Sequence, residues 1–228
     1  MTMTLQNIKA IAFDLDGTLV DSIPDLSAAA NAMRDFLGLP ALPSLRIQEH
    51  VGDGIGSLVH RAITDERDVE APADVWEKGY RFFIEYYRDH LTVHTTVYPG
   101  VTTGIGLMRA LNLPLVVITN KSERLAVPVL QQLGLADDFC LVLGGDSLPE
   151  KKPSAMPLLH ACATLGVSPH EIAMVGDSPN DVLTARAAGA TSIVVSYGYG
   201  DAATLGADLV LDSLTELYPL LRPNVQPA

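Results

Sequence analysis

Short apolar runs alternate with helix-like segments along most of this 228-residue chain. The apolar runs lie at residues 8–13, 115–118, 139–143, 172–175 and 193–195. The helix-like segments lie at residues 101–111, 123–133, 155–165 and 179–188, and a glycine follows each of the last three. Strands that alternate with helices are typical of a parallel sheet covered by helices on both faces. We therefore predict an α/β fold with a Rossmann-like parallel sheet as its core.

The alternation is interrupted once, between the first and the second apolar run. Residues 22–92 contain no convincing strand but show helical patterns at 23–37, 55–62 and 75–90. Trp76, Tyr80 and Phe83 recur there at helical spacing, which favours packing of the helices against one another. We interpret residues 22–92 as an inserted α-helical cap. Residues 1–21 and 93–228 would then form the α/β catalytic core.

Composition excludes some classes of partner. The formal net charge of −12 argues against a nucleic acid or an anionic membrane, because both are bound by clustered Lys and Arg. No apolar run approaches the roughly 18 residues of a membrane span, and the N-terminus lacks a signal-peptide pattern. Cys140 and Cys162 have no zinc-type spacing, so we expect two reduced core cysteines. We expect a cytoplasmic protein, either a monomer or a homodimer.

Polar side chains follow three of the apolar runs. They are Asp14 and Asp16 after the first run, Thr119 and Asn120 after the second, and Asp177 and Asp181 after the fourth. Ligands of open parallel sheets bind beyond the carboxyl ends of the strands, so these side chains should share one edge of the sheet. Four carboxylates at one place repel one another unless a cation joins them, and carboxylate oxygens are ligands that Mg²⁺ prefers. The pattern therefore predicts a Mg²⁺ site.

Each aspartate also has a simpler interpretation as the cap of the helix that follows it. For Asp177 or Asp181 alone, that interpretation is sufficient. Asp14 and Asp16 directly follow a buried apolar run, where two carboxylates carry a desolvation cost that a helix cap does not require. Asp25 is expected to be an ordinary charge near a helix N-terminus.

Four short motifs stand in order at the ends of these elements. They are Asp14-Leu15-Asp16-Gly17-Thr18, Thr119-Asn120, Lys152-Pro153, and Gly176-Asp177 with Asp181 four residues later. In this order they resemble the motifs of the haloacid dehalogenase superfamily of phosphotransferases. The resemblance covers essentially the whole core. It implies the α/β core with an inserted helical cap, and an enzyme that forms an aspartyl-phosphate.

Within this superfamily, further stretches are similar to the bacterial phosphoglycolate phosphatases. These stretches are residues 16–26, 51–54, 98–101, 144–146, 151–153 and 197–199. The chain departs from them at Ser154-Ala155, where those enzymes usually carry Asp-Pro or His-Pro, and this change should alter only the start of the next helix. The resemblance implies a small phosphorylated metabolite as the substrate, with 2-phosphoglycolate first. Open alternatives are a sugar phosphate such as an amino-sugar 6-phosphate, a phosphomutase reaction, or a regulatory protein without catalysis.

The resemblance also implies a role for each motif residue. Asp14 is the nucleophile, Asp16 is the general acid and base, and Lys152 supplies positive charge to the phosphoryl oxygens. The implied phosphate contacts are the backbone N–H near Leu15 and the residues Thr119, Asn120 and Lys152. The implied Mg²⁺ ligands are Asp14, the backbone carbonyl of Asp16, and Asp177, with Asp181 and Thr18 in supporting positions. For Thr18, a turn or capping role is the alternative.

Specificity must come from the cap, because the motifs contact only the phosphoryl group. Gly52 and Gly54 mark the predicted substrate loop, since glycine permits a close backbone approach. A plain loop before a helix is an equal alternative. Arg61 is the candidate cap cation for a substrate carboxylate.

Overall fold

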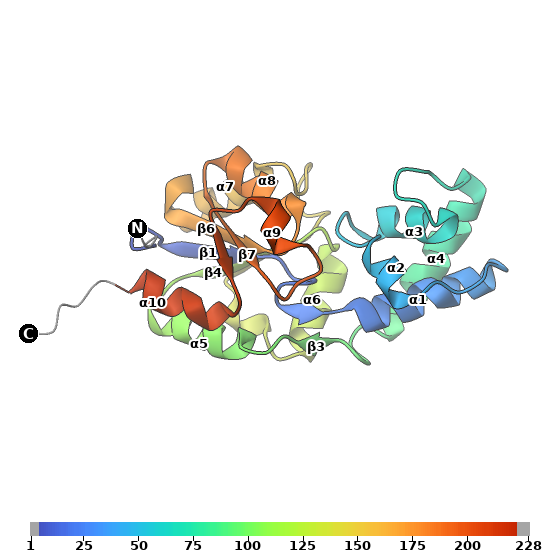
Figure 1. Ribbon diagram of the computed structural model, residues 1–228, viewed down its shortest axis with the longest axis horizontal. Helices are drawn as coiled ribbons and strands as arrows, with labels where there is room; N and C mark the ends of the chain where they lie inside the picture. Colours follow the sequence, from blue (N-terminus) through green and yellow to red (C-terminus); the bar gives the residue numbers. More distant parts are fainter. Residues whose placement is uncertain (1–4, 223–228) are drawn as a thin grey trace, which may run out of the picture.

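The computed structural model of the protein describes residues 5–222, so the first four and the last six residues of the predicted core lie outside it. Within the described residues, a six-stranded sheet forms the centre of the core (Figure 1). Its strands are β1 (Ala10–Phe13), β4 (Leu115–Ile118), β5 (Leu141–Leu143), β6 (Ile172–Gly176), β7 (Thr191–Val195) and β8 (Leu209–Leu211). They are all parallel, in the order β5-β4-β1-β6-β7-β8. This arrangement confirms the predicted fold class.

Helices cover both faces of the sheet. They are α5 (Val101–Ala110), α6 (Glu123–Gln132), α7 (Met156–Leu165), α8 (Pro179–Ala188) and α10 (Leu217–Leu221). Side chains alternate along β1, so Ile11 and Phe13 join the cluster that includes α5, α6 and α10. Ala10 and Ala12 point to the other face and join the cluster that includes residues of α7 and α8. The small alanine side chains allow α7 and α8 to lie close to the sheet.

The five predicted strands are all present, and β8 is a strand that the apolar pattern missed. It has three residues, lies at an edge of the sheet, and leaves Val210 44% exposed. A run this short, between Asp208 and Asp212, carries almost no periodic signal. The four-residue helix α9 (Ala202–Leu205) was missed for the same reason.

Within residues 22–92, the predicted cap, the regular secondary structure consists of helices. They are α1 (Ile23–Phe36), α2 (Ser44–Gln48), α3 (Ile55–Thr64) and α4 (Ala73–Asp89). Phe83 and Tyr87 of α4 are fully buried, and Trp76 stacks on Tyr80 with ring centroids 4.9 Å apart. The sequence analysis missed α2, which has only five residues. The structure therefore has an inserted helical cap, while its limits at residues 22 and 92 stay a prediction.

The chain leaves the core for the cap and returns at the same place (Figure 1). There, β2 (Val20–Asp21) and β3 (Thr96–Val97) form a two-stranded antiparallel sheet. The carboxylate of Asp25, in the first turn of α1, accepts hydrogen bonds from the backbone N–H groups of His94 and Thr95 and from the Thr95 hydroxyl. The expectation of an ordinary helix-end charge at Asp25 is wrong, because this buried carboxylate fastens the returning chain to α1.

Two expectations from composition concern the membrane and the cysteines. Among residues 5–222, no helix is both long enough and apolar enough to cross a membrane. Both cysteines are free, and Cys162 is buried as expected. Cys140 is exposed, so the prediction of a second core cysteine is wrong. Cys140 directly precedes β5, which is an edge strand of the sheet.

Candidate active site

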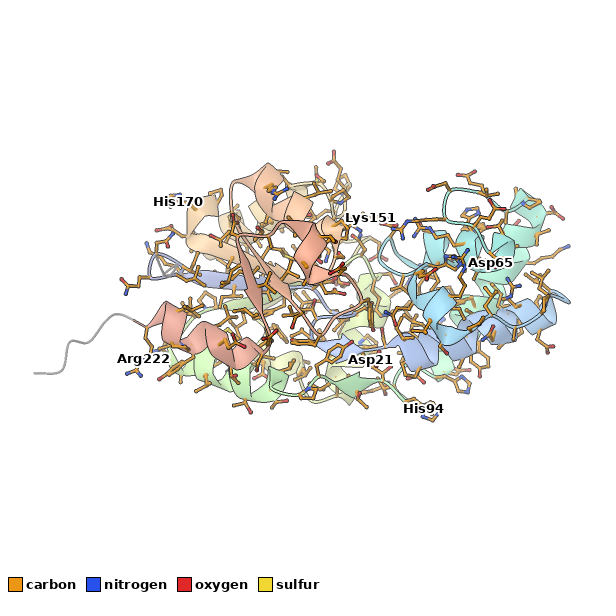
Figure 2. All side chains as sticks on the ribbon, viewed as in Figure 1. Asp21, Asp65, His94, Lys151, His170 and Arg222 are labelled. Carbon is orange, nitrogen blue, oxygen red and sulfur yellow. The ribbon has the colours of Figure 1, made fainter. Side chains whose placement is uncertain are left out.

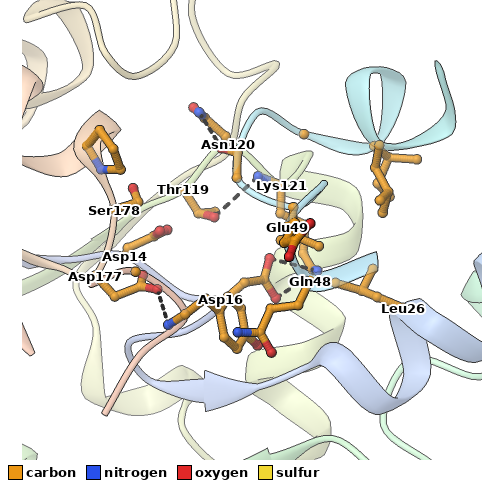
Figure 3. A pocket seen from close by; sticks show the side chains of 18 of the residues that line it. Asp14, Asp16, Leu26, Gln48, Glu49, Thr119, Asn120, Lys121, Asp177 and Ser178 are labelled. Atoms are coloured by element: carbon orange, nitrogen blue, oxygen red, sulfur yellow. Dashed lines mark hydrogen bonds and ion pairs between the residues drawn. The ribbon is translucent and has the colours of Figure 1, made fainter. Parts of the chain in front are cut away.

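Three neighbouring strands bring the predicted site residues to one edge of the sheet. β1 ends directly before Asp14, β4 ends directly before Thr119, and β6 ends directly before Asp177. Because these strands are adjacent and parallel, the loops that follow them line one pocket (Figure 3). The cap lines the same pocket through residues that include Gln48 and Gly52. The pocket therefore lies between the core and the cap.

Lys152 joins two of the predicted carboxylates. Its Nζ lies 2.9 Å from Oδ1 of Asp14 and 2.6 Å from Oδ1 of Asp181. The lysine is 2% exposed, and burial alone would lower the pKa of its ammonium. The charges of Asp14 and Asp181 outweigh burial and raise the pKa of Lys152 above its ordinary value, so the ammonium stays charged. Lys151, its neighbour, is exposed and lies at the junction of core and cap (Figure 2).

Asp14, Asp177 and Asp181 form a buried acidic cluster in which one oxygen of each lies within 4.8 Å of the others. Burial is the largest cause of a rise in the pKa of Asp14 to about 6, which the charge of Lys152 opposes. Burial, followed by the charges of Asp181 and Asp14, raises the pKa of Asp177 to about 8. The single positive charge of Lys152 cannot balance three ionised carboxylates, so the cluster keeps an excess of negative charge. Hard oxygen ligands with excess negative charge suit a divalent metal ion.

Asp181 acts through both of its carboxylate oxygens. Oδ2 accepts hydrogen bonds from the hydroxyl and the backbone N–H of Ser178, at 2.7 and 3.0 Å, and caps the first turn of α8. Oδ1 faces Lys152. Asp181 therefore caps a helix with one oxygen and contacts Lys152 with the other.

The Asp177 carboxylate is held from two sides. Its Oδ1 accepts a hydrogen bond from the Thr18 hydroxyl at 3.2 Å, and its Oδ2 accepts one from the backbone N–H of Tyr199 at 2.8 Å. Gly17 has a φ of +85°, and a Cβ atom there would lie 2.3 Å from Asp177 Oδ2. The glycine of the first motif is therefore required for this close approach. Tyr199 belongs to a stretch used for the family resemblance, but the sequence analysis gave it no role at the site.

Asp16 points away from the acidic cluster. Its Oδ1 accepts a hydrogen bond from the Ser22 hydroxyl at 2.6 Å, and the Nζ of Lys121 lies 2.9 Å from each of its carboxylate oxygens (Figure 3). Sequence analysis gave Lys121 no role, although a lysine two residues after Thr119 was the available signal. The two carboxylates of the first motif thus face different lysines, Lys152 and Lys121.

The second motif connects neighbouring loops. The amide of Asn120 donates hydrogen bonds to the backbone carbonyls of Gly52 and Lys152, both at 3.0 Å. Thr119 is almost fully buried, and its hydroxyl accepts a hydrogen bond from the backbone N–H of Lys121. The backbone N–H of Leu15 donates to Asp14 Oδ1 at 2.7 Å. Two of the predicted phosphate donors, Leu15 and Asn120, therefore have protein partners here.

The predicted substrate loop at Gly52 and Gly54 lines the pocket and is fastened to the core. Asn180 donates hydrogen bonds to the Gly52 carbonyl at 3.2 Å and to Asp53 Oδ1 at 2.8 Å. Arg61 pairs with the other Asp53 oxygen at 2.6 Å. The predicted cap cation Arg61 does not belong to the described lining of the pocket, because its guanidinium is turned to Asp53.

Comparisons with known proteins agree with this architecture. The haloacid dehalogenase-like hydrolase family matches residues 8–189. The chain is 69% identical to a phosphoglycolate phosphatase of Chromobacterium violaceum over 220 residues, covering 96% of this chain and 99% of the relative. It is 52% identical to a phosphoglycolate phosphatase of Neisseria meningitidis, covering 98% of each.

A solved structure shares the fold over nearly the whole length. It is described as a predicted phosphoglycolate phosphatase from Haemophilus somnus, and it superposes with a TM-score of 0.89 at 32% identity, covering 95% of this chain and 99% of that one. Both the family match and the curated relatives extend over more than half of the chain. The chain therefore belongs to the haloacid dehalogenase-like hydrolases and is one of their phosphatases.

Proposed function

We propose that this phosphatase depends on Mg²⁺ and hydrolyses 2-phosphoglycolate to glycolate and phosphate through an aspartyl-phosphate on Asp14. The observation that carries the mechanism is the placement of Asp14, which lines the pocket, pairs with Lys152 and belongs to the acidic cluster. The substrate is supported by the relatives that carry the name phosphoglycolate phosphatase at up to 69% identity.

In the first half-reaction, a carboxylate oxygen of Asp14 forms a bond to phosphorus while the bond from phosphorus to the leaving oxygen breaks. Lys152, 2.9 Å from Asp14, provides a fixed positive charge beside the phosphoryl oxygens. Thr119, Asn120 and the backbone N–H groups near Leu15 are the assigned phosphate contacts. To bind the phosphate, the side-chain amide of Asn120 and the backbone N–H of Leu15 would each have to give up a present hydrogen bond.

Asp16 is the assigned acid and base. In its protonated form Asp16 gives a proton to the leaving oxygen in the first step, and the resulting carboxylate accepts a proton from the water that attacks the aspartyl-phosphate in the second. The first motif places its carboxylate two residues after the nucleophile, and Ser22 and Lys121 hold it apart from the acidic cluster. This separation lets two neighbouring aspartates take different roles.

Asp14, Asp177 and the backbone carbonyl of Asp16 would hold the Mg²⁺, whose positive charge would reduce the repulsion between an anionic nucleophile and an anionic phosphate. Asp181 is assigned to a supporting position because its two oxygens already contact Lys152 and Ser178. Thr18 holds Asp177 in its orientation through the hydrogen bond at 3.2 Å.

The cap, residues 22–92 in this proposal, encloses the leaving group and excludes water. The loop at Gly52 and Gly54 approaches the core closely, since a Cβ atom at Gly54 would lie 2.8 Å from the Asn120 carbonyl oxygen. A loop this close leaves limited space above the pocket, which suits a small leaving group such as glycolate.

The test is a comparison of kcat/KM over a panel of phosphate monoesters, with release of free phosphate as the measurement. We expect 2-phosphoglycolate to give the highest value, ahead of hexose phosphates, amino-sugar 6-phosphates and nucleotides. A clear preference for a sugar phosphate would reject the substrate. Isomerisation of a hexose phosphate without phosphate release would reject the hydrolytic reaction.

A further inference from the structure

Lys121 is a buried cation that the mechanism above does not yet use. Its side chain is 2% exposed, and its Nζ contacts both oxygens of Asp16 at 2.9 Å and the hydroxyl of Tyr87 at 3.1 Å. Burial opposes the charge, but Asp16 and Tyr87 outweigh it and raise the pKa of Lys121 above its ordinary value. The ammonium is therefore charged and has Asp16 as its counter-ion. Such a buried charge is stable only while an anion stays beside it.

The position of Lys121 links the acid to the cap. Lys121 follows β4 in the core, whereas Tyr87 belongs to α4 of the cap. Lys121 and Asp16 both line the pocket that contains Asp14 (Figure 3). Among the described residues that line this pocket, Arg67 is the other one with a cationic side chain.

Arg67 differs from Lys121 in its surroundings. Its side chain is 58% exposed, donates a hydrogen bond to the backbone carbonyl of Glu49, and lies 3.8 Å from an oxygen of Asp53. Water screens an exposed charge of this kind, whereas it screens the buried charge of Lys121 much less. Lys121 is also the cation in direct contact with the proposed acid.

The chemistry of the leaving group fits this contact. In 2-phosphoglycolate, one methylene carbon bears both the bridging oxygen and the carboxylate. An acid at Asp16 must come within hydrogen-bond reach of the bridging oxygen, about 2.6–3.2 Å. The Lys121 ammonium, one hydrogen bond beyond Asp16, is then within reach of a carboxylate on the same carbon. We infer, on the basis of the proposed function, that Lys121 binds the substrate carboxylate. It thereby selects phosphate esters that carry a carboxylate on the ester carbon.

The contacts of Asp16 support an exchange of partners. To hold the leaving oxygen, Asp16 must withdraw one of its two oxygens from Lys121. An N–H of the ammonium is then free, and a substrate carboxylate both accepts it and keeps an anion beside the buried charge. A hydroxyl or a methyl group at the same place supplies no negative charge. Tyr87 meanwhile holds the ammonium from the cap side.

The experiment compares two esters that differ only in this group, 2-phosphoglycolate and ethyl phosphate. The measured quantity is the preference, which is kcat/KM for the first ester divided by kcat/KM for the second. Loss of acid positioning slows both alkyl esters, so the preference isolates recognition of the carboxylate. We expect Lys121→Met to reduce the preference by about 10- to 100-fold, the usual value of a hydrogen bond to a charged group. The control Arg67→Gln should leave the preference unchanged.

Tyr87→Phe removes one hydrogen bond to Lys121 and should lower the preference by a smaller factor, roughly 3- to 10-fold. If Lys121→Met does not fold, this variant decides, and an unchanged preference overturns the inference. An unchanged preference in folded Lys121→Met, or a collapse in Arg67→Gln instead, also overturns it. If the unmodified enzyme does not prefer 2-phosphoglycolate to ethyl phosphate, the proposed substrate itself fails, which is a different outcome.

Discussion

At the residue scale, the carboxylates of the active site differ in their ion-pair and hydrogen-bond partners. Asp14 and Asp181 share Lys152, Asp16 has Lys121, and Asp177 is held by neutral donors. Asp177 is thus the carboxylate with the least compensation, and its pKa rises to about 8. A cluster built in this way supports the proposed metal ion at Asp14 and Asp177, and Asp16, the proposed acid and base, has partners outside it.

Replacing the nucleophile should separate activity from stability. Asp14→Asn keeps the shape of the side chain but removes the attacking oxygen anion, so we expect phosphate release to fall by roughly 10³-fold or more. Burial raises the pKa of the Asp14 carboxyl to about 6, so its ionised form destabilises the fold at neutral pH. The midpoint of thermal unfolding should therefore stay equal or rise. Substantial phosphatase activity in pure Asp14→Asn protein would remove Asp14 from its role.

The two adjacent lysines provide a matched pair of variants. Lys152→Met leaves Asp14 and Asp181 without their buried cation, so we expect loss of activity together with about 3–5 kcal/mol of lost stability. Lys151→Met removes an exposed side chain whose ammonium contacts the backbone carbonyl of Asp53, and should cost under about 1 kcal/mol. Kinetics and denaturant unfolding of both variants measure this difference. Equal effects in the two would show that burial of Lys152 has no energetic consequence.

Asp14, Thr119 and Asp177 were predictable from sequence because each directly follows a strong apolar run, whereas Lys152 was predicted from the family resemblance. Asp14, Thr119 and Asp177 come together for that reason alone. The position of Lys121, two residues after Thr119, places it near the site, but only the fold shows that it is buried and that its ammonium contacts Asp16. The prediction for Arg61 failed because the sequence does not show that its guanidinium forms an ion pair with Asp53 in the fold.

At the scale of elements, the loop between α2 and α3 lines the pocket and joins the cap to the core. Core side chains fasten it, including Asn120 after β4 and Asn180 in the first turn of α8. This contact depends on chain segments far apart in the sequence, so no periodicity could predict it. Apolar patterns predicted the long elements, whereas the three residues of β8 and the five of α2 were too short to give a pattern.

Loosening this loop should weaken catalysis without harming the core. Asn180→Ala removes hydrogen bonds to the Gly52 carbonyl and the Asp53 carboxylate, each worth about 1 kcal/mol. We expect kcat/KM to fall by roughly 5- to 30-fold. Asn31→Ala is the control, because Asn31 makes similar bonds to the Leu42 backbone within the cap. It should lower stability but leave kcat/KM near its original value. The reverse pattern would exclude a role for the loop in closure.

At the scale of the whole molecule, the acidic cluster should make stability depend on pH and, through the proposed metal site, on Mg²⁺. A carboxyl with a raised pKa holds its proton more tightly in the folded protein than in the unfolded one. Its contribution to stability is complete below the unfolded pKa of about 3.9 and is lost as the pH rises through the folded value. With folded pKa values of about 6 for Asp14 and about 8 for Asp177, the metal-free protein should lose stability between about pH 4 and pH 8.

Mg²⁺ should reverse this loss by binding the ionised carboxylates. The increase in unfolding temperature on adding Mg²⁺ to chelator-treated protein should therefore be larger at pH 8 than at pH 5. The same treatment should stop phosphate release, and Mg²⁺ should restore it. Thermal scans with and without metal at several pH values provide the measurement. A metal-induced shift of the same size at every pH would argue against binding at this cluster.

The paired crossing of β2 and β3 has a consequence for protein engineering. All of the covalent connection between the two units runs through this one narrow ribbon, and the ends of the insert lie side by side there. An insert from a relative could therefore be transplanted as a cassette with only two splice points, provided that Asp25 and Thr95 travel with it to keep the return strand fastened. Such chimaeras would combine the core of this protein with the leaving-group preferences of other members of the superfamily.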